Sequence, residues 1–167
     1  DLVESEPDSR RGGRVILPHR LYLESLRSPF NVGAIFRAAE SFGVTEILIS
    51  HDCASPDHPR ARRAAMGTVE MVPWTVAGLE EARARGPLFL LETGGADVSA
   101  FAFPRAGTMV VGSEELGASP EARNEAARSG GVVSIRTGGL KGSLNVSVAV
   151  GIVVHAWFSA RSAETRD

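Results

Sequence analysis

The segment Pro29–Gly43, which reads PFNVGAIFRAAESFG, predicts a helix with one apolar face. Asn31 is a residue type that favours a helix N-cap, and Gly43 favours the position just beyond the C-cap. Apolar side chains recur at the spacing of one buried stripe, at Val32, Ile35, Phe36 and Ala39. Arg37 falls outside that stripe. Asn31 and Arg37 are therefore either a plain cap and a solvated charge or the polar groups of a functional site.

Around this helix, apolar β-rich runs alternate with helix-like runs. The expected strands are Arg20–Leu26, Glu46–Ser50, Val69–Pro73, Leu88–Glu92, Thr108–Gly112 and Val132–Ile135. The expected helices are Asn31–Phe42, Pro59–Met66, Val76–Arg85, Pro120–Ser129 and Ser143–Ala160. This alternation predicts an α/β fold with a mostly parallel sheet flanked by helices. Ligands bind such sheets beyond the carboxyl ends of the strands, where we expect Gly112 and the loop after Ile135.

The chain has 167 residues, which is enough for one domain and too few for two of ordinary size. Hydrophobic residues make up 43% and charged residues 23%, so the composition is that of a globular protein and not of a disordered one. We expect the folded domain to span residues 20–160 and a polar tail to follow at 161–167. Residues 1–19 are linker-like and compatible with the end of a removed N-terminal domain.

The sequence also restricts the cellular compartment. The longest apolar stretch, Val146–Phe158, is interrupted by polar residues and is too short for a membrane span. The acidic amino terminus lacks the basic start and apolar core of a signal peptide. The single cysteine, Cys53, excludes an intramolecular disulfide and fits a reducing compartment. We therefore expect a cytoplasmic protein with no membrane partner.

Charge is distributed unevenly along the chain. The net charge of −2 argues weakly against binding to nucleic acid. Arginines nevertheless gather in the first half of the chain, at Arg10, Arg11, Arg14, Arg20 and Arg27 and again at Arg60, Arg62 and Arg63. Acidic residues concentrate between Glu80 and Glu125. The first half could hold a phosphate backbone, unless these arginines are only solvated surface charges.

Three motifs follow one another along the chain. The first is P-x-N-x-G-A-I-x-R-x-A at Pro29–Ala39, the second is G-x-E-x-x-G at Gly112–Gly117, and the third is SLNVSVA at Ser143–Ala149. With the segment RRAAMGT at 62–68, they resemble the SpoU (TrmH-like) RNA ribose methyltransferases of the SPOUT class. The resemblance extends from about Leu21 to Phe158, nearly the whole chain.

The resemblance implies a C-terminal trefoil knot and a homodimer that builds its active site from both chains. It implies transfer of a methyl group from S-adenosylmethionine to a ribose 2′-hydroxyl of tRNA or rRNA. The expected cofactor-binding residues are Leu91, Gly112, Ile135, Ser143 and Leu144. The expected catalytic residues are Asn31, Arg37, Glu114, Ser143 and Asn145.

By the same resemblance, Arg37 acts on the 2′-hydroxyl. A guanidinium normally stays protonated in proteins, which makes it a poor general base. We therefore expect Arg37 to hold the adjacent phosphate and to stabilise the developing alkoxide.

Alternative functions are less well supported by the residues. Glu114 stands where a dinucleotide-binding fingerprint has its second glycine, and its charge would oppose a pyrophosphate. A non-catalytic RNA-binding protein with the same fold is the main alternative. Metal-ligand residue types gather between His51 and His58, but their spacing matches no established zinc pattern and the neighbouring prolines indicate an exposed loop. We expect no metal.

Overall fold

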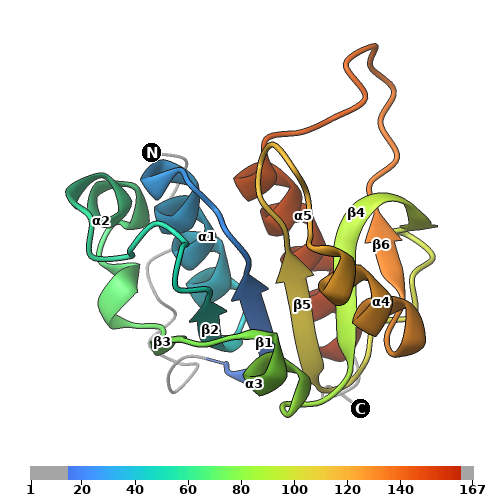
Figure 1. Ribbon diagram of the computed structural model, residues 1–167, viewed down its shortest axis with the longest axis horizontal. Helices are drawn as coiled ribbons and strands as arrows, with labels where there is room; N and C mark the ends of the chain where they lie inside the picture. The colour runs from blue at the N-terminus through green and yellow to red at the C-terminus, as the bar shows by residue number, and fades with distance from the viewer. Residues whose placement is uncertain (1–14, 163–167) are drawn as a thin grey trace.

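The computed structural model describes residues 15–162, which form a six-stranded sheet with helices on both faces (Figure 1). The strand order is β3-β2-β1-β5-β4-β6, and every pair of neighbours is parallel. The strands are β1 (Leu17–Leu23), β2 (Val44–Ile49), β3 (Trp74–Val76), β4 (Leu88–Asp97), β5 (Gly107–Val111) and β6 (Val132–Ser134). The parallel α/β sheet predicted from the sequence is confirmed.

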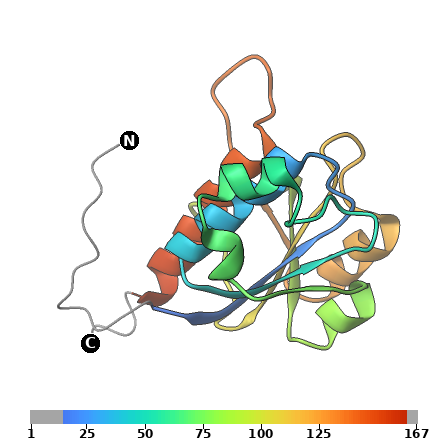
Figure 2. The same cartoon turned by 90° about the vertical axis from the view of Figure 1, so that its left-hand side faces the viewer.

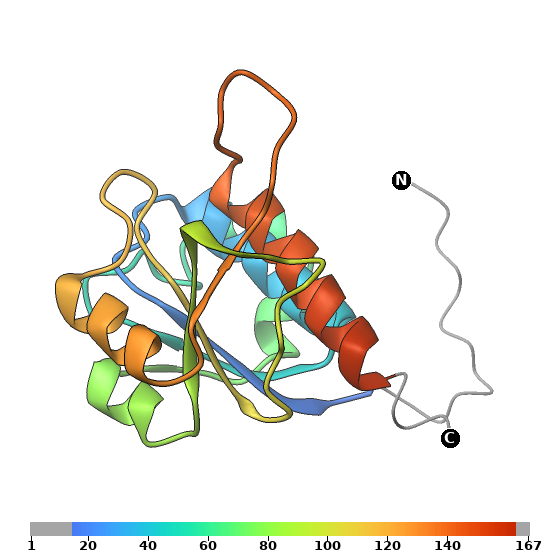
Figure 3. The same cartoon turned by 90° about the vertical axis from the view of Figure 1, so that its right-hand side faces the viewer.

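The helices divide between the two faces of the sheet (Figures 2 and 3). On one face α1 (Pro29–Ser41) and α5 (Val146–Ser162) lie side by side, and α2 (Pro59–Ala65) packs against α1. The other face carries α3 (Leu79–Arg83) and α4 (Pro120–Arg128). The larger core lies between the sheet and the α1–α5 layer, where the buried side chains include Phe36, Phe89 and Trp157.

Helix α1 buries the stripe predicted for it, because Val32, Ile35, Phe36 and Ala39 are all fully inaccessible to solvent. Its N-cap is Ser28 and not Asn31, since the Ser28 hydroxyl accepts a hydrogen bond of 3.2 Å from the Asn31 backbone N–H. This correction leaves the Asn31 side chain available for other contacts. Gly43 follows the helix with a φ of +74°, as its predicted place beyond the C-cap requires.

Gly33 determines how closely α2 approaches α1. A Cβ atom at this position would lie 2.1 Å from the backbone oxygen of Ala61, closer than any real contact allows. The first motif therefore contains glycine at this position because a backbone from the next helix occupies the space of its side chain.

The strand expected at 69–73 is wrong. Gly67 adopts a φ of +88°, and the chain then makes a 3-10 turn, η2 (Thr68–Glu70), in which the Thr68 hydroxyl donates to the Ala65 carbonyl. Strand β3 begins only at Trp74, where it pairs with Ile47 of β2. Local hydrogen bonds at a left-handed glycine thus outweigh the β propensity of the apolar residues.

Other element boundaries differ from the predicted ones by a few residues. Strand β1 starts at Leu17, inside the segment expected to be linker-like, and β4 continues to Asp97 with a register shift between Leu91 and Ala96. Val76 belongs to β3, so α3 is shorter than the expected helix. The linker expectation for residues 1–14 and the polar-tail expectation for 163–167 lie outside the described residues.

Candidate active site

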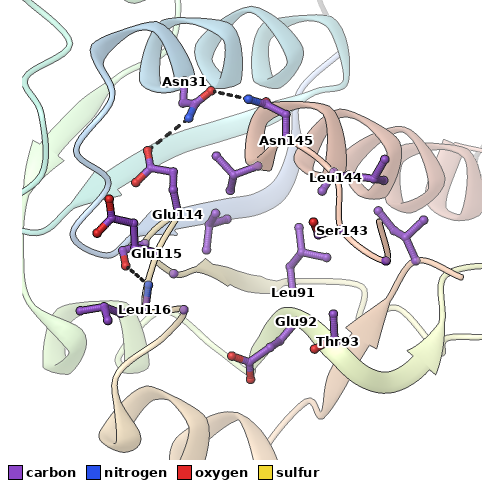
Figure 4. A pocket seen from close by; sticks show the side chains of 18 of the residues that line it. Asn31, Leu91, Glu92, Thr93, Glu114, Glu115, Leu116, Ser143, Leu144 and Asn145 are labelled. Carbon is purple, nitrogen blue, oxygen red and sulfur yellow. Dashed lines mark hydrogen bonds between the residues drawn. The ribbon is translucent and has the colours of Figure 1, made fainter. Parts of the chain in front are cut away.

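A pocket of about 610 Å³ opens beyond the carboxyl ends of the central strands (Figure 4). From β1 the chain proceeds toward β2, whereas from β5 it crosses through α4 to β6 at the opposite edge of the sheet. The neighbouring strands β1 and β5 therefore diverge in their connections, and the pocket lies on the β5 side of this switch point. The loops that follow β4, β5 and β6 contribute residues to its wall.

The loop after β5 presents Glu114 to this pocket. Ser113 and Gly117 exchange two backbone hydrogen bonds of 3.1 and 3.0 Å, which close a tight turn around Glu114. At Gly112 a Cβ atom would lie 2.2 Å from the backbone nitrogen of Ala118, so only glycine fits where this turn folds back on the strand. The glycines of the second motif thus shape the turn that carries the glutamate.

The Glu114 carboxylate is held by the loop that precedes α1. Its Oε2 accepts a hydrogen bond of 3.1 Å from the Arg27 backbone N–H, and its Oε1 accepts one of 3.2 Å from the Ser28 backbone N–H. Partial burial opposes ionisation, but these bonds, a bond from its own backbone N–H and one from Asn31 together lower the pKa of Glu114. The carboxylate is therefore ionised at neutral pH.

Asn31 and Asn145 extend this arrangement to a third segment (Figure 4). The Asn31 Nδ2 donates to Glu114 Oε1 at 3.2 Å, and the Asn31 Oδ1 accepts from Asn145 Nδ2 at 3.2 Å. The Asn145 Oδ1 in turn accepts from the Ser147 backbone N–H at 2.9 Å, at the start of α5. Because a carboxylate only accepts and a helix N-terminus only donates, both amides have a single possible orientation.

The same contacts explain why α5 begins later than predicted. The Asn145 side chain also accepts a 3.3 Å hydrogen bond from the Val148 backbone N–H, which makes it the cap of the helix. The helix therefore begins at Val146 and not at Ser143. Residues 143–145 form the wall of the pocket instead.

All residues predicted to bind the cofactor line this pocket: Leu91, Gly112, Ile135, Ser143 and Leu144. Four of the predicted catalytic residues line it as well: Asn31, Glu114, Ser143 and Asn145. The three motifs, far apart in the sequence, thus meet at one site.

Sequence reasoning missed further charged residues of the pocket. Glu92 and Arg123 line it and form an ion pair with an Nη2–Oε1 distance of 2.6 Å, and Glu115 lines it beside Glu114. Glu92 is the last residue of a predicted strand, so the rule on the carboxyl ends of strands could have identified it. Arg123 could not be identified in this way, because α4 brings it to the pocket from the far side of the sheet.

Arg37 lies elsewhere. Its side chain is exposed on α1 and lines a separate hollow of about 500 Å³ between α1 and α2, together with Arg63. Within one chain, the structure therefore does not bring Arg37 together with Glu114 and the two asparagines.

The polar segment after β2 forms hydrogen bonds and ion pairs within the chain. Asp57 pairs with Arg62 at 2.6 Å, and the His58 ring accepts a hydrogen bond from the Arg60 backbone N–H at 3.1 Å. Within residues 15–162, the His, Cys, Asp and Glu side chains nowhere form a group of three or more that could hold a metal ion.

In the same part of the chain, every helix is too short or too polar to cross a membrane.

Comparison with known proteins gives consistent matches. Residues 18–155 match the model of the SpoU rRNA Methylase family. The chain is 29% identical over 158 residues to "Ribosomal RNA small subunit methyltransferase G 2" of Syntrophobacter fumaroxidans, covering 94% of this chain and 28% of that protein. It is 27% identical over 156 residues to "23S rRNA (guanosine-2'-O-)-methyltransferase RlmB" of Pseudomonas syringae pv. tomato, covering 89% and 61% respectively.

A solved structure has the same fold. The SpoU methyltransferase AviRb from Streptomyces viridochromogenes, in complex with AdoMet, superposes with a TM-score of 0.78 at 22% identity. The match covers 90% of this chain and 60% of that one. The chain thus spans less than two thirds of the length of each of these three proteins.

Proposed function

Because the chain belongs to the SpoU rRNA Methylase family, we propose that it transfers a methyl group from S-adenosylmethionine to a ribose 2′-hydroxyl of rRNA or tRNA. The observation that carries this proposal is the hydrogen-bonded series Glu114–Asn31–Asn145, which joins the three motifs at the rim of one pocket. Such a series holds its polar groups in one orientation. Methyl transfer needs fixed polar groups because the ribose hydroxyl must be aligned with the methyl group that it attacks.

The pocket has the size and chemistry that S-adenosylmethionine requires. Its volume of about 610 Å³ lies in the usual range for small-molecule sites. Leu91, Ile135 and Leu144 supply apolar surface for a purine ring. The lining carboxylates of Glu92, Glu114 and Glu115 outnumber the single guanidinium of Arg123, which favours a ligand with a sulfonium and an ammonium over one with a pyrophosphate.

Bound S-adenosylmethionine would supply an electrophilic methyl group on its sulfonium. The ionised Glu114 carboxylate can accept a hydrogen bond from a ribose hydroxyl, and Asn31 keeps that carboxylate in place. Ser143 adds a hydroxyl on the wall of the pocket. Arg37 holds the phosphate next to the target nucleotide and stabilises the alkoxide that develops there.

The position of Arg37 requires a second copy of the chain in this proposal. Arg37 faces away from the pocket of its own chain, so it would act at the pocket of the partner in a homodimer. Helix α5 supports this assembly, because Val148 is 51% and Ile152 is 40% exposed along one face of the helix. Apolar residues at this spacing are suited to a helix–helix interface.

We include the trefoil knot and the cytoplasmic location in the same proposal. Family membership supports the knot, as does the path of the chain from β6 at one edge of the sheet to α5 beside α1. The lone, half-buried Cys53 fits a reducing compartment, where RNA substrates are present.

The test is transfer of labelled methyl from S-adenosylmethionine to separate pools of unmodified rRNA and tRNA. We expect label in one pool, and we expect an Asn31→Ala variant to lose it, because the side chain that joins Glu114 to Asn145 is then absent. Cofactor binding by calorimetry without transfer to either pool would instead favour a non-catalytic RNA-binding protein.

A further inference from the structure

The hollow between α1 and α2 has a composition that the proposed methyl transfer leaves largely unexplained. Its volume is about 500 Å³. One face of α1 forms one wall of the hollow, and the end of α2 forms the opposite wall. The lining residues are Phe30, Ala34, Arg37, Ala38, Ser41, Arg63, Ala64 and Met66. Within the described chain this lining contains two guanidinium groups and no carboxylate.

We propose that this hollow binds a single-stranded segment of RNA, with Arg37 and Arg63 on its phosphates and Phe30 and Met66 against an unstacked base. The inference rests on the proposed function and adds a defined RNA-binding site to it. Arg63 is the residue that it newly assigns, as a phosphate-binding residue.

The two arginines on α2 differ sharply in their surroundings. Arg62 forms ion pairs with Asp57 and Glu70, so its charge is already satisfied. Arg63, the next residue, points into the hollow, and no acidic partner for it occurs within residues 15–162. A guanidinium without a carboxylate partner can form forked hydrogen bonds with a phosphate, and a phosphodiester complements the charge of this hollow.

The apolar residues at the rim favour RNA over a simple anion. Phe30 is 58% exposed and Met66 is 63% exposed, although large apolar side chains usually avoid water. Met66 also adopts a φ of +55°, a left-handed conformation that is uncommon for a residue with a side chain. Proteins that bind single-stranded nucleic acids combine exposed aromatic and apolar side chains, which contact the bases, with basic groups, which contact the phosphates.

The location of the hollow fits RNA that also reaches an active site. Arg37 lines the hollow, and in the proposed homodimer it acts at the pocket of the partner, so RNA in the hollow would lie beside that pocket. Phosphate contacts of this kind set the register of a nucleic acid without reading its sequence. The hollow would therefore position RNA, and the selection of the target base would rest elsewhere.

The experiment measures binding of a fluorescein-labelled oligo(A) of ten nucleotides by anisotropy over a range of salt concentrations. We expect Arg63→Ala to weaken binding about fivefold to tenfold and to reduce the salt slope by about 1. The matched control is Arg62→Ala, which removes the same charge from the same helix and should leave both quantities unchanged. Equal effects of the two substitutions, or no binding by the wild type, would overturn the proposal.

A second variant separates base contacts from phosphate contacts. Met66→Gly relieves the left-handed backbone, so it should not destabilise the fold, while it removes the side chain at the rim. We expect it to weaken binding of oligo(A) about fivefold and to leave binding of an abasic oligomer of equal length unchanged. Equal weakening for both oligomers would contradict the base contact.

Methyl transfer distinguishes failure of this inference from failure of the proposed function. If the wild type methylates RNA and Arg63→Ala raises the KM for RNA no more than Arg62→Ala does, the hollow is not an RNA site although the function stands. If the wild type does not methylate RNA but Arg63→Ala still reduces the salt slope, the function fails and the hollow stands.

Discussion

The Asn145 side chain donates a 3.2 Å hydrogen bond to the Asn31 side chain and at the same time caps α5. One amide therefore joins the start of α5 to the start of α1, with its nitrogen serving the site and its oxygen serving the helix. Stability and activity can be separated at this residue because the two atoms have different tasks.

Asn145→Asp should impair activity without unfolding the protein. Aspartate caps a helix as well as asparagine does, but its carboxylate cannot donate to the Asn31 Oδ1. We expect the melting temperature to stay within about 2 °C of the wild type and kcat/KM for RNA to fall by about tenfold or more. Asn145→Ala, which loses both contacts, is the control and should lower both quantities. A fully active Asn145→Asp enzyme would contradict the role of the Asn31 contact.

Glu114 should make the free energy of unfolding decrease as the pH falls in the acidic range. Its pKa is lowered in the folded state, so its contribution is complete above the usual pKa of a glutamate and is lost as the pH falls through the folded value. We expect Glu114→Gln to be less stable than the wild type at pH 7 and the difference to shrink in acid. Urea unfolding at pH 7 and pH 4 measures this, and a difference that stays constant would argue against an ionised Glu114.

His19 should make the free energy of unfolding decrease as the pH falls from about 6.5 to about 4. It is buried and stacked on Trp157 with ring centroids 3.8 Å apart, and burial, aided by the charge of Arg161, lowers its pKa to about 4 despite a hydrogen bond to the Arg105 backbone. The unfolded chain binds a proton at His19 at a higher pH than the folded chain does. The free energy of unfolding therefore falls by about 3 kcal/mol over that range. His19→Phe retains a stacked ring without a titrating group, and its unfolding free energy should lack this part of the pH dependence.

Gly33→Ala should destabilise the packing of α2 on α1. The new Cβ atom would lie 2.1 Å from the Ala61 carbonyl oxygen, so the helices must separate, at a cost of about 1–3 kcal/mol. Gly139→Ala is the control, because a Cβ atom there has no neighbour within 4 Å, and it should change stability by less than about 0.5 kcal/mol. Chemical denaturation compares the two, and equal effects would show that the close approach at Gly33 has no energetic importance.

Ile152→Glu tests the proposed homodimer. A charge on the exposed apolar face of α5 should convert the dimer to a monomer and reduce methyl transfer, since Arg37 would no longer reach a partner's pocket. Binding of S-adenosylmethionine should change little, because Ile152 does not line the pocket. The molar mass from light scattering decides the matter, with Leu140→Glu in the exposed loop as the control that should keep the wild-type mass. An Ile152→Glu protein of unchanged mass would place any interface elsewhere.

The sequence could predict the α/β class, most of the elements and part of the lining of the pocket. The pattern of apolar residues within a short segment is visible in the sequence. It predicts the buried stripe of α1 and the runs that form β2, β4 and β5. It could not predict the turn at Thr68–Glu70, where a left-handed glycine and a side-chain hydrogen bond replace the expected strand. It also missed the true cap of α1, because Ser28 and Asn31 are both favourable capping residues.

By itself, the sequence determined which residue types are available to the site and in which motifs they stand. Only the tertiary structure decided their partners: Asn31 with Glu114 and Asn145, Glu92 with Arg123, and Arg37 in a hollow with Arg63 rather than in the pocket. The physical reason is that helix and strand periods act over a few residues, whereas these contacts join segments that strand order and helix packing bring together across the whole sheet.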